Sequence, residues 1–229
     1  DGFGCFVAID GSTIVAGANY AGTGSAAYIF LTTDGGATYG QVAKLTAADA
    51  AAGHFIGQSV AIDGGTVVIG AWGDDDGGSM SGSAYVFALP STDYAQLAKL
   101  VAGDAAADDR FGYSVAIDGD TIVVGAYYKN SGTGAVYVLR TSEGGATYVE
   151  VAKLTASDAA SNDYFGNSVA IDGNTVVVGA DQWNTDRSGV AYVFRTTEGG
   201  ATYGQVAKLT ADDAAAGDRF GTSVAIDGD

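Results

Sequence analysis

The sequence predicts an all-β protein built from repeated four-stranded antiparallel sheets. The first observation is a recurring stretch, Phe-Gly-Tyr-Ser-Val-Ala-Ile-Asp-Gly at 111–119, with copies at 56–64, 165–173 and 220–228 and an altered copy at 3–11. The closing glycines of these copies are 53 to 55 residues apart, which marks a repeat protein. The second observation is that the segments between turns are short and rich in Val, Ile and Tyr. The third is that no segment sustains the 3.6-residue period of a helix.

Each repeat unit contains four predicted strands, which in the unit that begins at residue 111 are 111–118, 121–126, 135–140 and 148–154. The first two are joined by Asp118-Gly119, a dipeptide that supplies the positive φ of a tight hairpin. The last two are joined by Gly-Gly-Ala-Thr-Tyr at 144–148, with copies at 35–39 and 199–203 and a different connection at 89–94. We therefore expect each unit to fold as a four-stranded meander.

The first strand of the unit predicts how the sheets pack. Its large side chains are expected on one face and its small ones on the other, because strand side chains alternate. The large set is Phe111, Tyr113, Val115 and Ile117, and the small set is Gly112, Ser114 and Ala116. A single four-stranded sheet cannot bury both of its faces, whereas copies repeated around an axis can. The predicted fold is therefore a β-propeller with one sheet per blade.

Two dipeptides give the units a family resemblance. A Phe-Gly pair opens the first strand, and a Gly-Ala pair closes the second at 17–18, 70–71, 125–126 and 179–180. The chain resembles the FG-GAP repeat family, which builds the propeller of integrin α subunits and of many bacterial and algal surface proteins. The proline that follows Gly-Ala in the family is replaced here by Asn19, Trp72, Tyr127 and Asp181. The resemblance implies an extracellular or cell-surface location and a non-enzymatic role in structure or adhesion.

The repeats define a single domain with units at about 3–55, 56–110, 111–164 and 165–219, followed by a partial fifth unit at 220–229. The first strand thus occurs five times, whereas the other three occur four times each. A ring closed by strand exchange would lack a first strand at one end. We therefore expect residues 1–229 to be part of a longer array, and we expect its open ends to favour self-association, because each end exposes a stackable sheet.

Composition limits the partners. The chain has 10 Lys and Arg against 27 Asp and Glu, a net charge of −17. Nucleic acids and anionic membranes would be repelled by this charge, so we expect neither as a partner. No run of about 18 apolar residues is present, which argues against membrane insertion. Cys5 is the single cysteine, so the chain cannot form an internal disulfide.

The connections between the second and third strands of each unit vary most, so we expect them to form a recognition face for a protein or a glycan. Aromatic residues lie in or beside these loops and are the predicted ligand-binding residues: Tyr20, Trp72, Tyr127, Tyr128 and Trp183. Aromatic rings stack on sugars and anchor protein partners. The alternative, that they pack over the rim of the blade, stays open.

Acidic loops raise the question of calcium. The densest cluster is Asp74, Asp75 and Asp76, which we name as the candidate Ca²⁺ ligands, with a solvated acidic loop as the alternative. The connections between units carry pairs of residues five apart: Asp104 with Asp109, Asp158 with Asp163, Asp213 with Asp218, and Asp49 with His54. These pairs either hold a cation or cap local turns, and we favour caps. The integrin Ca²⁺ loops cannot be carried over, because the corresponding hairpin here is a bare Asp-Gly turn.

No catalytic residues are predicted. His54 is the single histidine and replaces an aspartate of the repeat, so the sequence offers no nucleophile–histidine set in its other units. We expect a structural or adhesive module that mediates protein–protein or cell-surface contacts. The alternative is a carbohydrate-binding, lectin-like propeller, with or without a dependence on calcium.

Overall fold

The structure is a computed structural model that describes residues 2–19, 25–89, 94–142, 145–182, 187–197, 200 and 202–228. The described residues form four four-stranded antiparallel sheets, each with its strands in chain order, so the predicted meander is confirmed. The first sheet contains β1 (Phe3–Asp10), β2 (Thr13–Ala18), β3 (Ala26–Leu31) and β4 (Gly40–Leu45). The second contains β5 (Ser59–Asp63), β6 (Thr66–Ala71), β7 (Ser83–Ala88) and β8 (Gln96–Leu100). The third contains β9 (Phe111–Asp118), β10 (Thr121–Ala126), β11 (Ala135–Arg140) and β12 (Val149–Leu154), and the fourth contains β13 (Phe165–Asp172), β14 (Thr175–Ala180), β15 (Val190–Thr196) and β16 (Tyr203–Leu209). One four-residue helical turn, α1 (Lys129–Gly132), follows β10.

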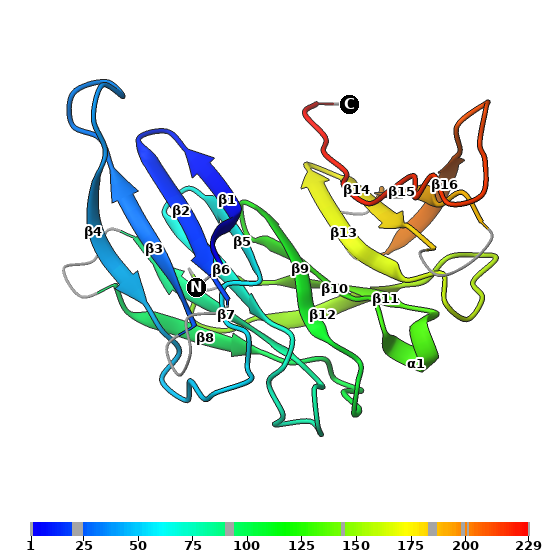
Figure 1. Cartoon of the computed structure of the whole chain (residues 1–229), viewed down its shortest axis with the longest axis horizontal. Helices are drawn as coiled ribbons and strands as arrows, with labels where there is room; N and C mark the ends of the chain where they lie inside the picture. Colours follow the sequence, from blue (N-terminus) through cyan, green and yellow to red (C-terminus); the bar gives the residue numbers. More distant parts are fainter. Residues whose placement is uncertain are drawn as a thin grey trace.

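The sheets are the blades of a propeller. Figure 1 shows them following one another along an arc, from the blue first sheet to the orange fourth. Neighbouring blades meet through their first strands, since β1 contacts β5, β5 contacts β9 and β9 contacts β13. These four strands therefore line the inside of the arc, and β4, β8, β12 and β16 form the outer edges of their sheets.

The hydrophobic core lies between the blades, as the alternating strands predict. Three buried clusters each combine residues of two consecutive sheets. Between the third and fourth blades, for example, Val136 and Val138 of β11 join Phe165, Val178 and Tyr192 of the next sheet. Each blade is thus stabilised chiefly by burying a face against its neighbour.

The Phe-Gly and Gly-Ala pairs place two glycine backbones in contact between blades. A Cβ atom added to Gly125 would lie 2.1 Å from the carbonyl oxygen of Gly166, which belongs to the next blade. The other three interfaces repeat this approach, with Gly17 against Gly57, Gly70 against Gly112 and Gly179 against Gly221. Both dipeptides therefore need glycine because no side chain fits between the two backbones.

Hydrogen bonds reinforce the same interfaces. Ser114 Oγ donates to the carbonyl oxygen of Gly166 at 2.8 Å, with equivalent bonds from Ser59 to Gly112 and from Ser168 to Gly221. The Asp-Gly hairpins are linked as well, because the backbone N–H of each turn glycine donates to the turn aspartate of the preceding blade. These pairs are Gly64 with Asp10, Gly119 with Asp63, Gly173 with Asp118, and Gly228 with Asp172.

Two expectations for the first strand are wrong. Tyr113 does not join Phe111, Val115 and Ile117 in the core between blades. The register of β9 on β10 shifts between Ser114 and Phe111, and Gly112 has a φ of +85°, so a bulge breaks the alternation. The fifth copy at 220–228 is also not a strand along its length. It forms one bridge, between Phe220 and Gly189, and residues 221–228 are not in a strand. The described residues contain no following strand with which they could pair.

Candidate functional site

The residue just before each Phe-Gly position has an unusual backbone. Phe55, Arg110, Tyr164 and Arg219 have φ values between 54° and 58°, a left-handed conformation that bulky residues rarely adopt. This conformation recurs at the end of the molecule where one blade passes into the next. The connections after β6, β10 and β14 lie at the same end, because a meander returns there after every second strand. The four side chains therefore meet the variable loops.

Together these residues form an aromatic–arginine belt, which we define as Phe55, Trp72, Arg110, Tyr127, Tyr128 and Tyr164. The guanidinium of Arg110 lies 5.2 Å from the ring centre of Trp72, 5.3 Å from that of Tyr127 and 4.5 Å from that of Tyr128. Phe55 stacks on Trp72 at 4.3 Å, and Tyr164 stacks on Tyr128 at 6.2 Å. The belt thus runs across three consecutive blades, held by stacking and cation–π contacts.

Beside the belt lies a pocket of about 410 Å³, which we call the axial pocket. It is lined by Phe6, Tyr113, Tyr127, Asn167, Asp181, Arg219 and Thr222. Phe6, Tyr113 and Asn167 come from the first strands of the first, third and fourth sheets, so the pocket lies where the inner strands converge. One wall is an ion pair, in which Arg219 Nη2 donates to the buried carboxylate of Asp181 at 2.6 Å.

The structure brings together three of the five aromatic residues named from the sequence. Trp72, Tyr127 and Tyr128 meet through Arg110, as described above. Tyr20 and Trp183 lie outside the described residues. Sequence reasoning missed Phe55, Arg110, Tyr113, Tyr164, Asp181 and Arg219. For Phe55, Arg110, Tyr164 and Arg219 the one sequence signal is that the position before Phe-Gly varies among bulky residues within an otherwise uniform repeat.

A second recurring arrangement joins each inter-blade loop to the outer strands of the next sheet. In the third blade, Tyr137 Oη donates to Asp104 Oδ1 at 2.6 Å, and Lys153 Nζ donates to Asp104 Oδ2 at 2.5 Å. The second blade repeats this with Tyr85 and Lys99 on Asp49, and the fourth with Tyr192 and Lys208 on Asp158. We call each set an Asp–Tyr–Lys cluster. Each cluster fastens the loop that enters a blade to that blade.

The second aspartate of each loop pair caps a turn, as expected. Asp109 accepts the N–H of Ala106 at 2.8 Å, and Asp163 and Asp218 accept those of Ala160 and Ala215. A polar group from the variable loop then covers this carboxylate. Lys129 Nζ donates to Asp109 at 2.6 Å in the third blade.

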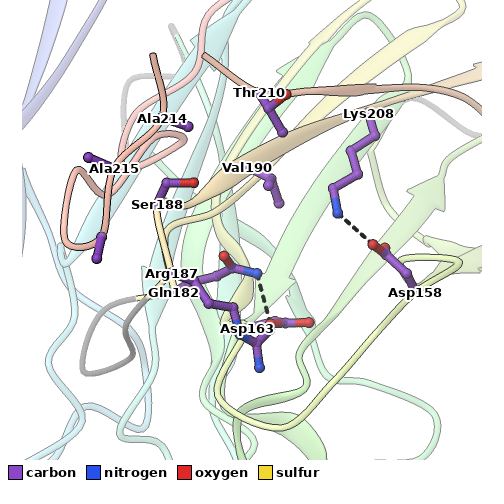
Figure 2. Close-up of a pocket in the computed structure, with 11 residues that line it drawn as sticks. Asp158, Asp163, Gln182, Arg187, Ser188, Val190, Lys208, Thr210, Ala214 and Ala215 are labelled. Atoms are coloured by element: carbon purple, nitrogen blue, oxygen red, sulfur yellow. Dashed lines mark hydrogen bonds and ion pairs between the residues drawn. The ribbon is translucent and has the colours of Figure 1, made fainter. Parts of the chain in front are cut away.

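In the fourth blade Gln182 Nε2 donates to Asp163 at 2.9 Å, and Arg187 pairs with the same carboxylate. Figure 2 shows these three side chains together in a pocket of about 420 Å³, with Lys208 reaching Asp158 beside them. The pocket's two carboxylates therefore already face two cations of the chain itself. Its charge is balanced within the fold.

The second blade differs, because its buried carboxylate belongs to the variable loop and not to the loop between blades. His54 stands in place of the second aspartate, and its Nδ1 lies 3.3 Å from Asp74 Oδ2 of the variable loop. Lys99 Nζ donates to Asp74 at 3.0 Å and to Asp76 at 2.5 Å, in addition to Asp49 at 2.6 Å. All three protons of this ammonium are therefore used. Asp75 is exposed and lies 3.8 Å from His54 Nε2.

Electrostatics within this cluster follow from these contacts. Burial alone would raise the pKa of Asp74, but hydrogen bonds from Lys99 and Tyr85 lower it below its ordinary value. Burial alone would lower the pKa of Lys99, but its bonds to Asp49, Asp76 and Asp74 raise it. The cluster is thus a fixed set of carboxylates around an ammonium. A Ca²⁺ ion that binds Asp74, Asp75 and Asp76 has to compete with Lys99.

Two features of these side chains differ from what local patterns suggest. A lysine on the outer strand of a sheet is ordinarily solvated, yet Lys99, Lys153 and Lys208 reach back to the loop aspartates. Both aspartates of a loop pair were expected to cap local turns, yet the first accepts hydrogen bonds from a tyrosine and a lysine. The reason is that both partners come from the following sheet, the tyrosine 33 to 36 residues away and the lysine 49 or 50 residues away. No local pattern reports such a distant partner.

Two features are absent from the described residues. No group of three or more His, Cys, Asp and Glu side chains is arranged to hold a metal ion within the described part. Among the same residues, no helix combines the length and apolar character needed to cross a membrane.

Comparison with known proteins identifies the repeats. The family model described as FG-GAP repeat matches residues 39–87, 94–139, 148–194 and 203–229. These segments cover more than half of the 229 residues. A search of curated proteins finds no match to the chain.

Proposed function

Because this chain belongs to the FG-GAP repeat family, we propose that it is an extracellular structural or adhesion module that contacts proteins or cell surfaces through its variable-loop face. FG-GAP repeats are found in integrin-like extracellular proteins, and propellers of this family are generally non-enzymatic. The structure supports a binding role at one end of the blades, because that end combines a uniform frame with side chains that differ between units.

The observation that carries the proposal is the aromatic–arginine belt. Trp72, Arg110 and Tyr128 are partly exposed, and they are clustered within a few ångströms of one another. Clusters of Trp, Tyr and Arg supply most of the binding energy at protein interfaces, because they bury large areas with few rotatable bonds. In a chain with a net charge of −17, the guanidinium of Arg110, held on three aromatic rings, also adds a positive charge to this face.

A second candidate is carbohydrate binding at the same face, and the observation that favours it is the axial pocket beside the belt. It combines aromatic rings with a carboxylate, an amide and a guanidinium in one concave site. Such a combination is typical of small-ligand sites. Calcium at Asp74, Asp75 and Asp76 belongs to this candidate as a proposal, in which it orders the variable loop of the second blade.

The experiment compares binding of the labelled chain to intact cells of the organism that encodes it. The test variant carries Trp72→Ala and Tyr128→Ala, which remove two belt rings. The control is Tyr39→Ala, which removes a partly exposed tyrosine from the connection between β3 and β4, at the opposite end of the blades. Circular dichroism confirms that each variant folds.

We expect the belt variant to lose at least tenfold in cell binding and the control to bind as the wild-type chain does, because the contact depends on the belt. Equal binding by all three proteins would overturn the proposal for this face. Loss in the Tyr39→Ala variant alone would move the contact to the other end.

A further inference from the structure

The axial pocket contains an amide, that of Asn167, whose hydrogen-bonding capacity is not fully used within the described residues. Asn167 Oδ1 is buried and has no hydrogen-bond partner there. Its amide nitrogen makes one long bond, to the carbonyl oxygen of Thr222 at 3.4 Å. An amide in a concave site with this much spare capacity is suited to a ligand that both donates and accepts hydrogen bonds.

The pocket also has apolar surface. Phe6 is 39% exposed, and the ring of Tyr113 packs against Tyr127 with centres 4.2 Å apart. Burial raises the pKa of Tyr113, so its hydroxyl stays protonated at neutral pH and can donate a hydrogen bond. The pocket therefore offers flat apolar rings next to donors and acceptors.

The charges of the lining residues cancel. Asp181 is buried and Arg219 is half exposed, and they form one ion pair at 2.6 Å. A charged ligand would meet an attractive and a repulsive group at similar distances and would lose its hydration without compensation. A neutral ligand can instead use the carboxylate as acceptor and the guanidinium as donor at the same time.

From these features we propose that the axial pocket binds a neutral saccharide unit. A sugar ring has an apolar face that packs on aromatic rings, and its hydroxyls donate and accept hydrogen bonds. The pocket's volume of about 410 Å³ lies within the range of small-molecule sites. This inference rests on the proposed function, since it makes the variable-loop face the recognition face and assigns one class of ligand to it.

The test is calorimetric titration of the full chain with glucose, galactose, mannose and N-acetylglucosamine, and with the charged analogues glucosamine and glucuronate. We expect at least one neutral sugar to bind with a stoichiometry of one and more tightly than both charged analogues. Asn167→Ala and Tyr113→Phe should each weaken that binding about fivefold, the equivalent of one hydrogen bond. The matched control, Asn174→Ala, changes an exposed asparagine in the β13–β14 turn and should leave binding unchanged.

A fourth variant tests the charge argument. Asp181→Asn removes the negative charge of the Asp181–Arg219 pair, so the net charge of the pocket lining becomes positive. Glucuronate should then gain at least tenfold in affinity relative to the neutral sugar. This gain of function requires a folded protein, so it cannot be mistaken for unfolding.

Three results would overturn the inference: no binding of any of the four neutral sugars to the folded chain, binding that Asn167→Ala and Tyr113→Phe both leave unchanged, or tighter binding of a charged analogue to the wild-type chain. These failures are separable from failure of the proposed function. If the belt variant loses cell binding while no sugar binds, the adhesive function stands and the saccharide site is wrong. If sugar binds but cell binding is insensitive to the belt, the saccharide site stands and the proposed adhesive contact is wrong.

Discussion

Replacing Gly125 by alanine should separate the third blade from the fourth. Gly125 is the second-last residue of β10, and the added Cβ would lie 2.1 Å from the carbonyl oxygen of Gly166 and 2.3 Å from Ser114 Oγ. The first of these atoms belongs to the backbone of the next blade, so no side-chain rotation can relieve the clash. The two sheets have to move apart.

The expected magnitude follows from two effects. Overpacking of a close contact costs about 1–3 kcal/mol. The separation also breaks the hydrogen bond from Ser114 Oγ to Gly166, now 2.8 Å long, at a cost of about 1 kcal/mol. The sum is about 3 kcal/mol, which corresponds to a fall of about 6–12 °C in the thermal midpoint for a domain of this size.

Gly204→Ala is the matched control. Gly204 also lies in a strand, β16, but no atom lies within 4 Å of its added Cβ, and its φ is outside the left-handed range. This variant should unfold within a few degrees of the wild-type chain, or slightly above it, because alanine restricts the unfolded chain. Circular dichroism at increasing temperature measures the midpoints, and hydrogen exchange locates the change. We expect faster exchange at Ser168 and unchanged exchange in β5 and β6. Equal midpoints for the two variants would refute the argument that the glycine contact is rigid.

The remaining predictions concern the Asp–Tyr–Lys clusters. Lys99→Met leaves the carboxylates of Asp49, Asp74 and Asp76 without their shared ammonium. Millimolar Ca²⁺ should then raise the thermal midpoint of this variant by several degrees relative to EDTA, because a ligand at 100 times its Kd adds about 2.7 kcal/mol. Lys153→Met, whose cluster holds one loop carboxylate, should respond less, and an equal response in both would contradict the assignment. Burial alone would raise the pKa of Asp104, but bonds from Lys153 and Tyr137 and the charge of Lys129 lower it from 3.8 to about 2. A lowered pKa contributes stability above pH 3.8 that is lost as the pH falls toward 2. Asp104→Asn should therefore flatten the dependence of the thermal midpoint on pH in that window. The control, Asp108→Asn, changes an exposed residue of the same loop and should leave that dependence unchanged.

The strands, hairpins and blades of this protein were predictable, because the sequence patterns that specify them lie within a few residues of one another. Asp118-Gly119 predicts a two-residue hairpin, and the structure pairs Asp118 with Thr121 across it. The Phe-Gly and Gly-Ala pairs predict the repeat and the blade. Even here, local reasoning gave the wrong face for Tyr113, because a single left-handed glycine, Gly112, shifts the register.

The candidate site was only partly predictable, for a physical reason. Trp72 and Tyr128 were found because aromatic residues in variable loops are conspicuous. Arg110 was not, because its contacts join side chains from two different blades, and its importance depends on a backbone conformation that the sequence does not display. The same holds for Lys99, whose carboxylate partners lie 50, 25 and 23 residues away.

The backbone strain before Phe-Gly supports a functional origin for the belt. A left-handed conformation costs a non-glycine residue about 1–2 kcal/mol. Glycine fits this position without strain, since Gly2 occupies it in the first unit with a φ of 62°. Three later units nevertheless place Phe55, Arg110 and Tyr164 there, and each of these side chains contacts a ring of a variable loop. The strain is therefore offset by what these side chains contact. The backbone conformation before Phe-Gly is thus the same in these units while the side chain differs, so the propeller can present a different side chain for recognition at the same place in each blade.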